Sequence, residues 1–97
     1  MPPLTVGFTS EALADIAKIV QESIDRFGVQ QAARYNAAIR ASCDRVGEYP
    51  HIGSVQPDLP SVVAYPSGTH RIYYSIESTH VLILRILHQR VRLSDAD

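Results

Sequence analysis

Two apolar runs near the C-terminus constrain the fold of this chain more than any other feature of its sequence. The runs are His70-Arg-Ile-Tyr-Tyr-Ser-Ile76 and His80-Val-Leu-Ile-Leu-Arg-Ile-Leu-His88, and the polar triplet Glu77-Ser-Thr79 separates them. Because both runs are rich in β-branched and aromatic residues, the pattern predicts a β-hairpin. The second run is apolar on both faces except at Arg85, and a charge inside a buried strand needs a partner or a functional reason.

Two helices are predicted before the hairpin. The first begins at Thr9 or Ser10, either of which can cap it, and ends at Phe27, because Gly28 is a natural C-terminal cap. Its apolar residues recur at three- and four-residue steps and define one stripe, made of Leu13, Ile16, Ala17, Val20, Ile24 and Phe27. The second helix is predicted from about Val29 to about Val46. A connection this short makes the two helices antiparallel neighbours.

The remaining segments predict the rest of the sheet. Residues 4–8 are interpreted as an edge strand, residues 47–61 as a loop packed against the body, and residues 61–65 as a short strand. The order strand-helix-helix-strand-strand-strand predicts one α+β domain over residues 1–97. In this two-layer fold, an antiparallel helical hairpin packs on an antiparallel sheet of three to four strands.

Composition and charge exclude several classes of protein. The single cysteine, Cys43, rules out an internal disulfide and is typical of a reducing compartment. No apolar run approaches the roughly 18 residues of a membrane span, and the N-terminus lacks the features of a signal peptide. We therefore expect a cytoplasmic protein with no membrane partner. The net charge of −1 argues against stable direct binding of nucleic acid, and no motif for a metal or cofactor is present.

Strict alternation divides the side chains of the last strand between two faces of the sheet. We expect Leu82, Leu84, Ile86 and His88 to face the helices. Arg85 then lies on the open face with Val81, Ile83 and Leu87. Two interpretations of Arg85 stay open: it pairs with an acidic residue while its stem covers the sheet, or it contacts an anion or a partner protein.

Histidines and tyrosines in the hairpin are a second set of candidates. His70, His80 and His88 fall at strand ends, where solvent exposure is the simplest interpretation. Beside Tyr73 or Tyr74, two imidazoles could instead perform acid–base chemistry near neutral pH. The two tyrosines are sequence neighbours in a strand, so we expect them to point to opposite faces.

Cationic residues also follow the last strand. The segment from Val91 to Asp97 is predicted to fray unless Val91 or Leu93 anchors it. A mobile positive tail can steer toward an acidic partner surface. The predicted target-binding residues are therefore Arg85, His88, Arg90 and Arg92. The alternative is that Arg90 and Arg92 only balance Asp95 and Asp97.

Six short motifs carry a resemblance that spans nearly the whole chain. They are Ser10-Glu-Ala-Leu-Ala-Asp-Ile16, Phe27-Gly28, Ala32-Ala-Arg-Tyr35, Tyr49-Pro-His-Ile-Gly53, His70-Arg-Ile-Tyr-Tyr74 and Leu84-Arg-Ile-Leu-His88. In this order and spacing, the chain resembles the ParE/RelE superfamily of toxins from type II toxin–antitoxin systems, most closely its ParE branch. The sequence departs from ParE-like chains at Val63, where they often carry arginine. It departs again at residues 89–92, where they often carry aspartate.

The resemblance implies a function and a partner. A ParE-like toxin binds and inhibits DNA gyrase without being an enzyme, and forms a hetero-oligomer with a cognate ParD-like antitoxin that neutralises it. The alternative is a RelE-like ribosome-dependent mRNA endoribonuclease, in which Arg85, Arg71 and His88 would be catalytic. The predicted strands contain only two cations, Arg71 and Arg85, to stabilise a phosphorane-like transition state, and this favours the gyrase inhibitor. A third hypothesis is a non-toxic domain that retains only antitoxin binding. The antitoxin-binding residues are not predicted.

Overall fold

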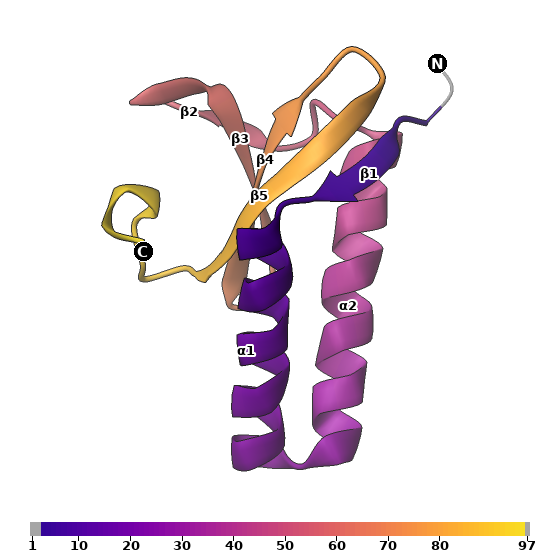
Figure 1. Ribbon diagram of the computed structural model, residues 1–97, viewed down its shortest axis with the longest axis vertical. Helices are drawn as coiled ribbons and strands as arrows, with labels where there is room; N and C mark the ends of the chain where they lie inside the picture. The colour runs from indigo at the N-terminus through magenta and orange to yellow at the C-terminus, as the bar shows by residue number, and fades with distance from the viewer. Residues whose placement is uncertain (1–2, 97) are drawn as a thin grey trace.

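Two helices lie against one face of a sheet in the computed structural model, which describes residues 3–96 (Figure 1). Met1, Pro2 and Asp97 lie outside the described residues. The elements are β1 (Thr5–Phe8), α1 (Ser10–Phe27), α2 (Val29–Glu48), β2 (Ser54–Gln56), β3 (Leu59–Ser67), β4 (His70–Ile76), β5 (His80–His88) and a 3₁₀ turn (Leu93–Asp95). The predicted two-layer α+β fold is confirmed.

Local signals place both ends of α1 and the start of α2 as predicted, whereas α2 continues past the predicted end near Val46 to Glu48. The hydroxyl of Thr9 accepts a hydrogen bond from the backbone N–H of Ala12 at 3.0 Å and so caps α1. Gly28 joins the helices with φ 88°, a left-handed backbone conformation that side chains other than glycine rarely adopt. Within the described residues, neither helix is apolar enough over a sufficient length to cross a membrane.

The sheet has five strands in the order β1-β5-β4-β3-β2, more than the three to four predicted. β1 pairs with β5 in parallel, and the other neighbours are antiparallel. The additional strand, β2, lies inside the predicted loop 47–61, and β3 begins at Leu59 rather than Ser61. β2 escaped prediction because it has only three residues and its pairing is interrupted by an irregularity between Val55 and Gln56.

The helix-facing side of the sheet holds the main core. Its buried members come from both helices and from β3, β4 and β5: Ala12, Ile16, Ile19, Ile39, Cys43, Val46, Val63, Ile72, Tyr74, Val81, Ile83 and Ile86. The predicted stripe on the first helix is partly wrong, because Leu13 and Phe27 are 48% and 67% exposed and Ala17 is exposed as well. Phe27 lies at the tip of the hairpin, where the helices extend beyond the sheet (Figure 1).

A bulge in β5 shifts the alternation of side chains. Tyr74 pairs with Ile83 and Tyr73 pairs with Arg85, so that Leu84 is an extra residue opposite Tyr73. Val81, Ile83 and Ile86 therefore all face the helices. The prediction that Leu82 and Leu84 face the helices is wrong, because one inserted residue reverses the phase of every residue before it. Ile86 faces the helices as predicted.

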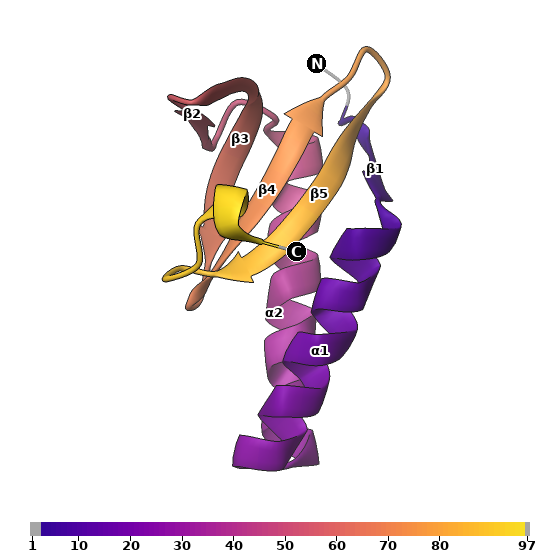
Figure 2. The same ribbon diagram turned by 60° about the vertical axis from the view of Figure 1, so that its left-hand side comes forward.

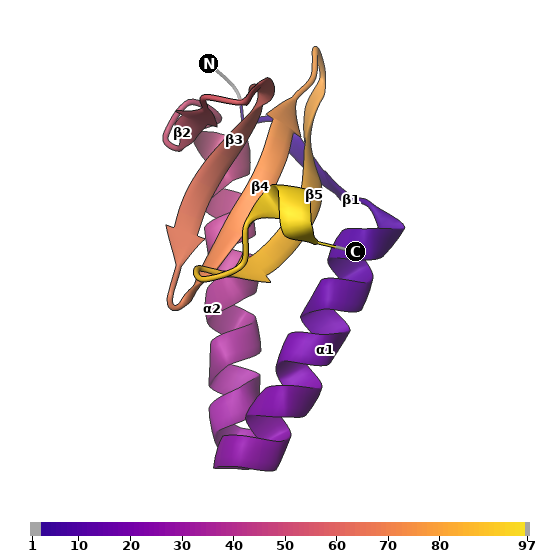
Figure 3. The same cartoon turned by 90° about the vertical axis from the view of Figure 1, so that its left-hand side faces the viewer.

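The open face of the sheet is covered by the end of the chain. After β5 the chain reverses, and the turn Leu93–Asp95 lies over β4 and β5 on the side away from the helices (Figures 2 and 3). Leu93 and Ala96 pack there against a second cluster that includes Tyr73 and Leu87. Tyr73 and Tyr74 thus point to opposite faces, as predicted. The tail does not simply fray, because Leu93 anchors it.

Candidate functional site

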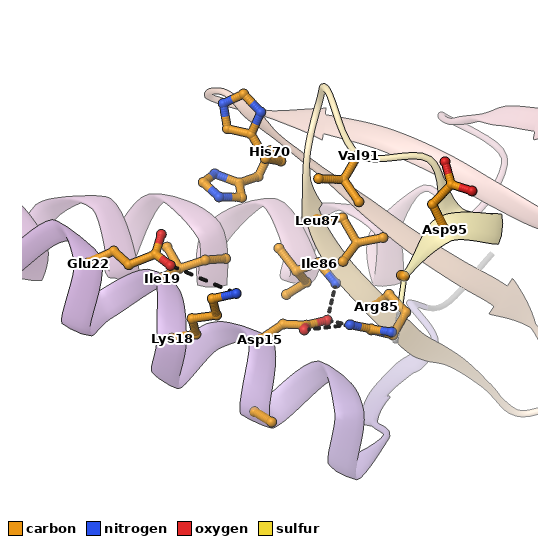
Figure 4. Close-up of a pocket in the computed structure, with 13 residues that line it drawn as sticks. Asp15, Lys18, Ile19, Glu22, His70, Arg85, Ile86, Leu87, Val91 and Asp95 are labelled. Carbon is orange, nitrogen blue, oxygen red and sulfur yellow. Dashed lines mark hydrogen bonds and ion pairs between the residues drawn. The ribbon is translucent and has the colours of Figure 1, made fainter.

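A groove runs between α1 and the ends of β4 and β5 (Figure 4). It consists of two adjoining cavities of about 400 Å³ and about 570 Å³. Ile19, Glu22, His70 and His88 line both cavities. The groove therefore brings together residues from α1, from two strands and from the tail.

The first end of the groove holds Arg85 against Asp15 of α1 (Figure 4). The Nε and Nη2 atoms of Arg85 donate to the two carboxylate oxygens of Asp15 at 2.8 and 2.9 Å. The backbone N–H of Ile86 also donates to Asp15, at 2.9 Å. The side chains of Arg85 and Asp15 are only 19% and 12% exposed. A bidentate pair of this kind is geometrically specific.

Asp15 also completes the edge of β5. β1 pairs with β5 only as far as Ile83. Beyond that point, the backbone N–H of Thr9 donates to the carbonyl of Ile83, and the Thr9 hydroxyl donates to the carbonyl of Leu84. The Asp15 carboxylate then accepts from Ile86. The start of α1 thus satisfies backbone groups that a longer β1 would have paired.

One of the two interpretations of Arg85 was that it pairs with an acidic residue, and the structure shows this pair with Asp15. Arg85 pairs with Tyr73 in the register of the sheet, so it belongs to the open face as predicted. Its guanidinium meets the largely buried Asp15 of α1, beyond the point where β1 stops pairing with β5. A role of Arg85 in contacting a target stays a prediction. Any such role must use a guanidinium that Asp15 already holds in place.

The second end of the groove contains two contacting imidazoles. His70 and His88 are paired across β4 and β5, and their ring centroids are 5.5 Å apart in an edge-to-face arrangement. The Nδ1 atom of His70 lies 2.6 Å from the hydroxyl oxygen of Tyr35 on α2. Burial lowers the pKa of His70, the neighbouring His88 lowers it further, and Glu22 opposes both effects.

Several groove residues were not predicted as site residues. Tyr35 was noted as part of a motif, and Glu22 and Arg26 were not singled out from the first helix. Their positions in the groove depend on how the helical hairpin lies on the sheet, and spacing within one helix does not carry that information. The imidazole pair could have been predicted, because His70 is the first residue of the predicted hairpin and His88 is the last. The first and last residues of a hairpin lie opposite each other on its two strands.

The three residues predicted for the ribonuclease alternative do not share one face. Arg71 is exposed and precedes Ile72 and Tyr73, so alternation places it on the open face with Tyr73. His88 contacts His70 on the helix side. Arg85 is held at the sheet edge by Asp15. Arg71 and His88 therefore lie on opposite faces of the sheet, and the guanidinium of Arg85 is already bound by the Asp15 carboxylate.

Arg90 and Arg92 are exposed and follow the end of β5. Arg90 lines the larger cavity, and its backbone N–H donates to Nδ1 of His88 at 3.1 Å. Asp95, one of the two predicted acidic counterparts, lines the smaller cavity, and Asp97 lies outside the described residues. Among residues 3–96, no three His, Cys, Asp or Glu side chains gather closely enough to hold a metal ion.

The lowered pKa of His70 predicts a dependence of stability on pH. A histidine whose pKa is lower in the folded state than in the unfolded state binds fewer protons when folded. The contribution of His70 to the free energy of unfolding is therefore complete above the unfolded-state pKa of about 6.5. That contribution is lost as the pH falls below this value. We expect the His70→Asn variant, which keeps an acceptor for Tyr35 but does not titrate, to lose less stability on acidification. Urea unfolding at several pH values measures this, and equal pH dependence in both proteins would contradict it.

Comparison with known proteins identifies relatives over most of the chain. The family model described as "ParE toxin of type II toxin-antitoxin system, parDE" matches residues 6–93. The chain is 37% identical over 81 residues to Toxin ParE1 of Caulobacter vibrioides, covering 80% of this chain and 81% of that protein. It is 29% identical over 82 residues to Toxin ParE1 of Mycobacterium tuberculosis, covering 82% of this chain and 84% of that protein.

Solved structures with the same fold include toxin–antitoxin complexes. The RelBE2 complex of Mycobacterium tuberculosis contains a chain with a TM-score of 0.70 and 27% identity, covering 90% of this chain and 99% of that one. The chromosomal ParDE system of P. aeruginosa contains one with a TM-score of 0.78, 18% identity, and coverage of 88% and 95%. At this lower identity the likeness to ParDE shows the fold alone.

Proposed function

This chain belongs to the ParE toxin family of type II toxin–antitoxin systems, and on that premise we propose that it acts by binding and inhibiting DNA gyrase. A cognate ParD-like antitoxin neutralises it in a hetero-oligomer. Toxicity in this proposal comes from occupying a partner surface, not from chemistry performed on a substrate. The protein acts in the cytoplasm, where gyrase and chromosomal DNA are found.

The position of Arg71 and His88 on opposite faces of the sheet, with Arg85 already bound by Asp15, is the observation that carries this proposal. RNA cleavage requires cationic and acid–base groups to converge on one phosphate. Here Arg71 is on the open face, His88 is on the helix side, and Asp15 already neutralises Arg85. The geometry supports an inhibitor that binds rather than an enzyme that cleaves.

Arg90 and Arg92 make up the proposed target-binding surface together with Arg85 and His88. They are exposed at the end of β5, where the chain leaves the sheet. Arg90 lines the neighbouring cavity of about 570 Å³, which offers space for a partner side chain. Exposed cations at such a position can steer association with an acidic partner surface.

Replacing Arg90 and Arg92 together with alanine is expected to relieve growth arrest on induced expression. The charges are exposed, so their removal costs little stability and weakens target binding instead. The matched control is the Arg34→Ala/Arg45→Ala variant, which removes two exposed charges from α2. Antitoxin binding should be retained in both variants. If growth arrest is equally strong in the Arg90→Ala/Arg92→Ala variant and in the control, the tail has no role in the mechanism.

Exposed apolar side chains beside β2 are a proposed contact for the antitoxin. They are Tyr49, Ile52, Val55 and Leu59. Because β2 is the last strand of the sheet, its outer edge can accept an added strand. We expect the Val55→Ser/Leu59→Ser variant to weaken copurification with the co-expressed antitoxin at least tenfold and to remain folded. Unchanged copurification would place the antitoxin elsewhere.

Induced expression with two assays in parallel tests the proposed function. The proposal expects loss of DNA supercoiling in the cells and intact mRNA on their ribosomes. Ribosome-dependent cleavage that disappears in the Arg85→Ala variant would instead assign the chain to the ribonuclease alternative. Absence of any growth arrest, with antitoxin binding retained, would identify a non-toxic domain.

A further inference from the structure

The turn that follows β5 is fastened by a neutral histidine. The backbone N–H of Arg90 donates to Nδ1 of His88 at 3.1 Å. A backbone N–H can only donate, so Nδ1 carries no proton and the neutral ring bears its proton on Nε2. An imidazolium has protons on both nitrogens and cannot accept this bond. The contact therefore exists only while His88 is uncharged.

The neighbouring histidine contacts both His88 and the hydroxyl of Tyr35. The hydroxyl oxygen of Tyr35 accepts a hydrogen bond from the backbone N–H of Thr69 at 3.2 Å. Its nearest partner is Nδ1 of His70 at 2.6 Å, which accepts the hydroxyl proton when Nδ1 is unprotonated and donates to the hydroxyl when Nδ1 is protonated. The edge-to-face contact of His70 with His88 tolerates one charged ring, but two imidazolium rings at 5.5 Å repel each other.

The charged groups around this pair compensate only in part for a second proton, because Glu22 alone raises the pKa of His70. From α1 the groove receives Lys18, Glu22, Arg26 and Asp15, from α2 the Tyr35 hydroxyl, from β5 Arg85, and from the tail Arg90 and Asp95. Asp15 is engaged with Arg85, and Glu22 lies 4.0 Å from Lys18. Arg26 and Arg90 line the larger cavity with both histidines. These two guanidinium groups therefore disfavour protonation of both histidines.

The same turn carries the chain from one face of the sheet to the other. The N–H of Gln89 donates to the carbonyl of Thr69, and the N–H of Val91 donates to the carbonyl of His88. Past this turn, Leu93 and Ala96 pack on the open face. A change in the turn at residues 88–91 is thus transmitted directly to the segment that covers the open face (Figure 3).

We propose that protonation of the His70–His88 pair opens the turn at residues 88–91 and releases residues 91–96 from the open face of the sheet. Mild acidification then changes how Arg90 and Arg92 are presented and uncovers the apolar side chains beneath the tail. The consequence for target binding rests on the proposed function, whereas the release of the tail does not. If a histidine has a higher pKa when the tail is released than when it is docked, its protonation favours release. Each pKa unit of that difference raises the ratio of released to docked molecules about tenfold at full protonation.

NMR of the full chain between about pH 7.5 and about pH 5 tests this proposal, because imidazoles titrate in that range. The readout is the nuclear Overhauser contact between the Leu93 methyl groups and the Tyr73 ring, with the ring signals of both histidines reporting their protonation. The proposal predicts that this contact is lost in step with protonation of the pair. The His88→Asn variant, whose side-chain oxygen can accept from Arg90 without titrating, is expected to keep it at low pH.

The control is the His80→Asn variant, which removes a histidine at the other end of β5 and should release its tail as the wild-type protein does. A tail contact that survives in the wild-type protein once both rings are protonated would overturn the proposal. So would a pair that stays neutral at about pH 5, or release in His88→Asn at the same pH as in the wild type. None of these results depends on gyrase, so a failure here is distinguishable from a failure of the proposed function.

Discussion

Replacing Ile83 with alanine is expected to lower the free energy of unfolding by about 2–5 kcal/mol. The Ile83 side chain is fully buried in the helix-facing core, where it lies with Ile16, Ile39 and Tyr74. Its truncation removes apolar area and leaves a cavity that neighbours from three elements cannot easily fill. This is a large share of the total stability of a small domain. Urea unfolding followed by circular dichroism measures the loss.

The neighbouring residue provides the matched control. Leu84 is only partly buried and packs on the open face beneath the tail. We expect Leu84→Ala to cost about 1–2 kcal/mol, because less apolar area leaves water at this position when the chain folds. If Leu84→Ala proved as costly as Ile83→Ala, the register of the β5 bulge would be wrong.

Removing the Asp15 carboxylate is expected to cost about 2–4 kcal/mol. Asp15→Ala eliminates both hydrogen bonds from Arg85 and the one from the Ile86 backbone. The N–H of Ile86 then lacks its acceptor at an edge that β1 does not reach. The estimate is below that for a fully buried pair, because water can reach both side chains.

A double-mutant cycle separates the ion pair from the edge contact. Arg85→Met keeps most of the apolar stem and removes the guanidinium, and the double variant with Asp15→Ala gives the coupling. We expect Asp15→Ala to remain costly in the Arg85→Met background, because the Ile86 backbone still loses its acceptor. A cost below about 0.5 kcal/mol for Asp15→Ala in the wild-type background would show that the carboxylate has no structural role.

Features determined by local sequence were predicted correctly. Thr9 caps α1 and Gly28 separates the helices, because capping and positive φ depend on a few adjacent residues. The hairpin of β4 and β5 follows from two apolar runs and a polar break. Cys43 lies in the interior of α2, where burial raises the pKa of its thiol to about 11, in agreement with a packing role.

The β5 bulge was not predictable from alternation. Leu82, Leu84, Ile83 and Val81 are all apolar, so the pattern contains no polar residue to reveal which set faces water. A single extra residue then reverses the assignment for half of the strand. The partner of Arg85, Asp15, is 70 positions away along the chain, and the pattern of the strand does not reveal it.

Only part of the candidate groove could be predicted, because the rest depends on contacts between residues far apart in the sequence. His88 and Arg90 line the groove and lie at the end of the last strand, which the sequence marks clearly. The roles predicted for them and for Arg92 stay predictions. Tyr35 and Glu22 enter the groove only because α1 and α2 cross the sheet at that level. Their contribution depends on tertiary packing, and no periodicity within one helix encodes it.

Supercoiling by purified DNA gyrase tests the central claim most directly. The account predicts that the full chain inhibits supercoiling of relaxed plasmid, that the Arg90→Ala/Arg92→Ala variant inhibits at least tenfold less strongly, and that prior addition of the antitoxin abolishes inhibition. The same preparations are added to translating ribosomes, where mRNA is expected to remain intact. Undiminished supercoiling at toxin concentrations that cause ribosome-dependent mRNA cleavage would contradict the account.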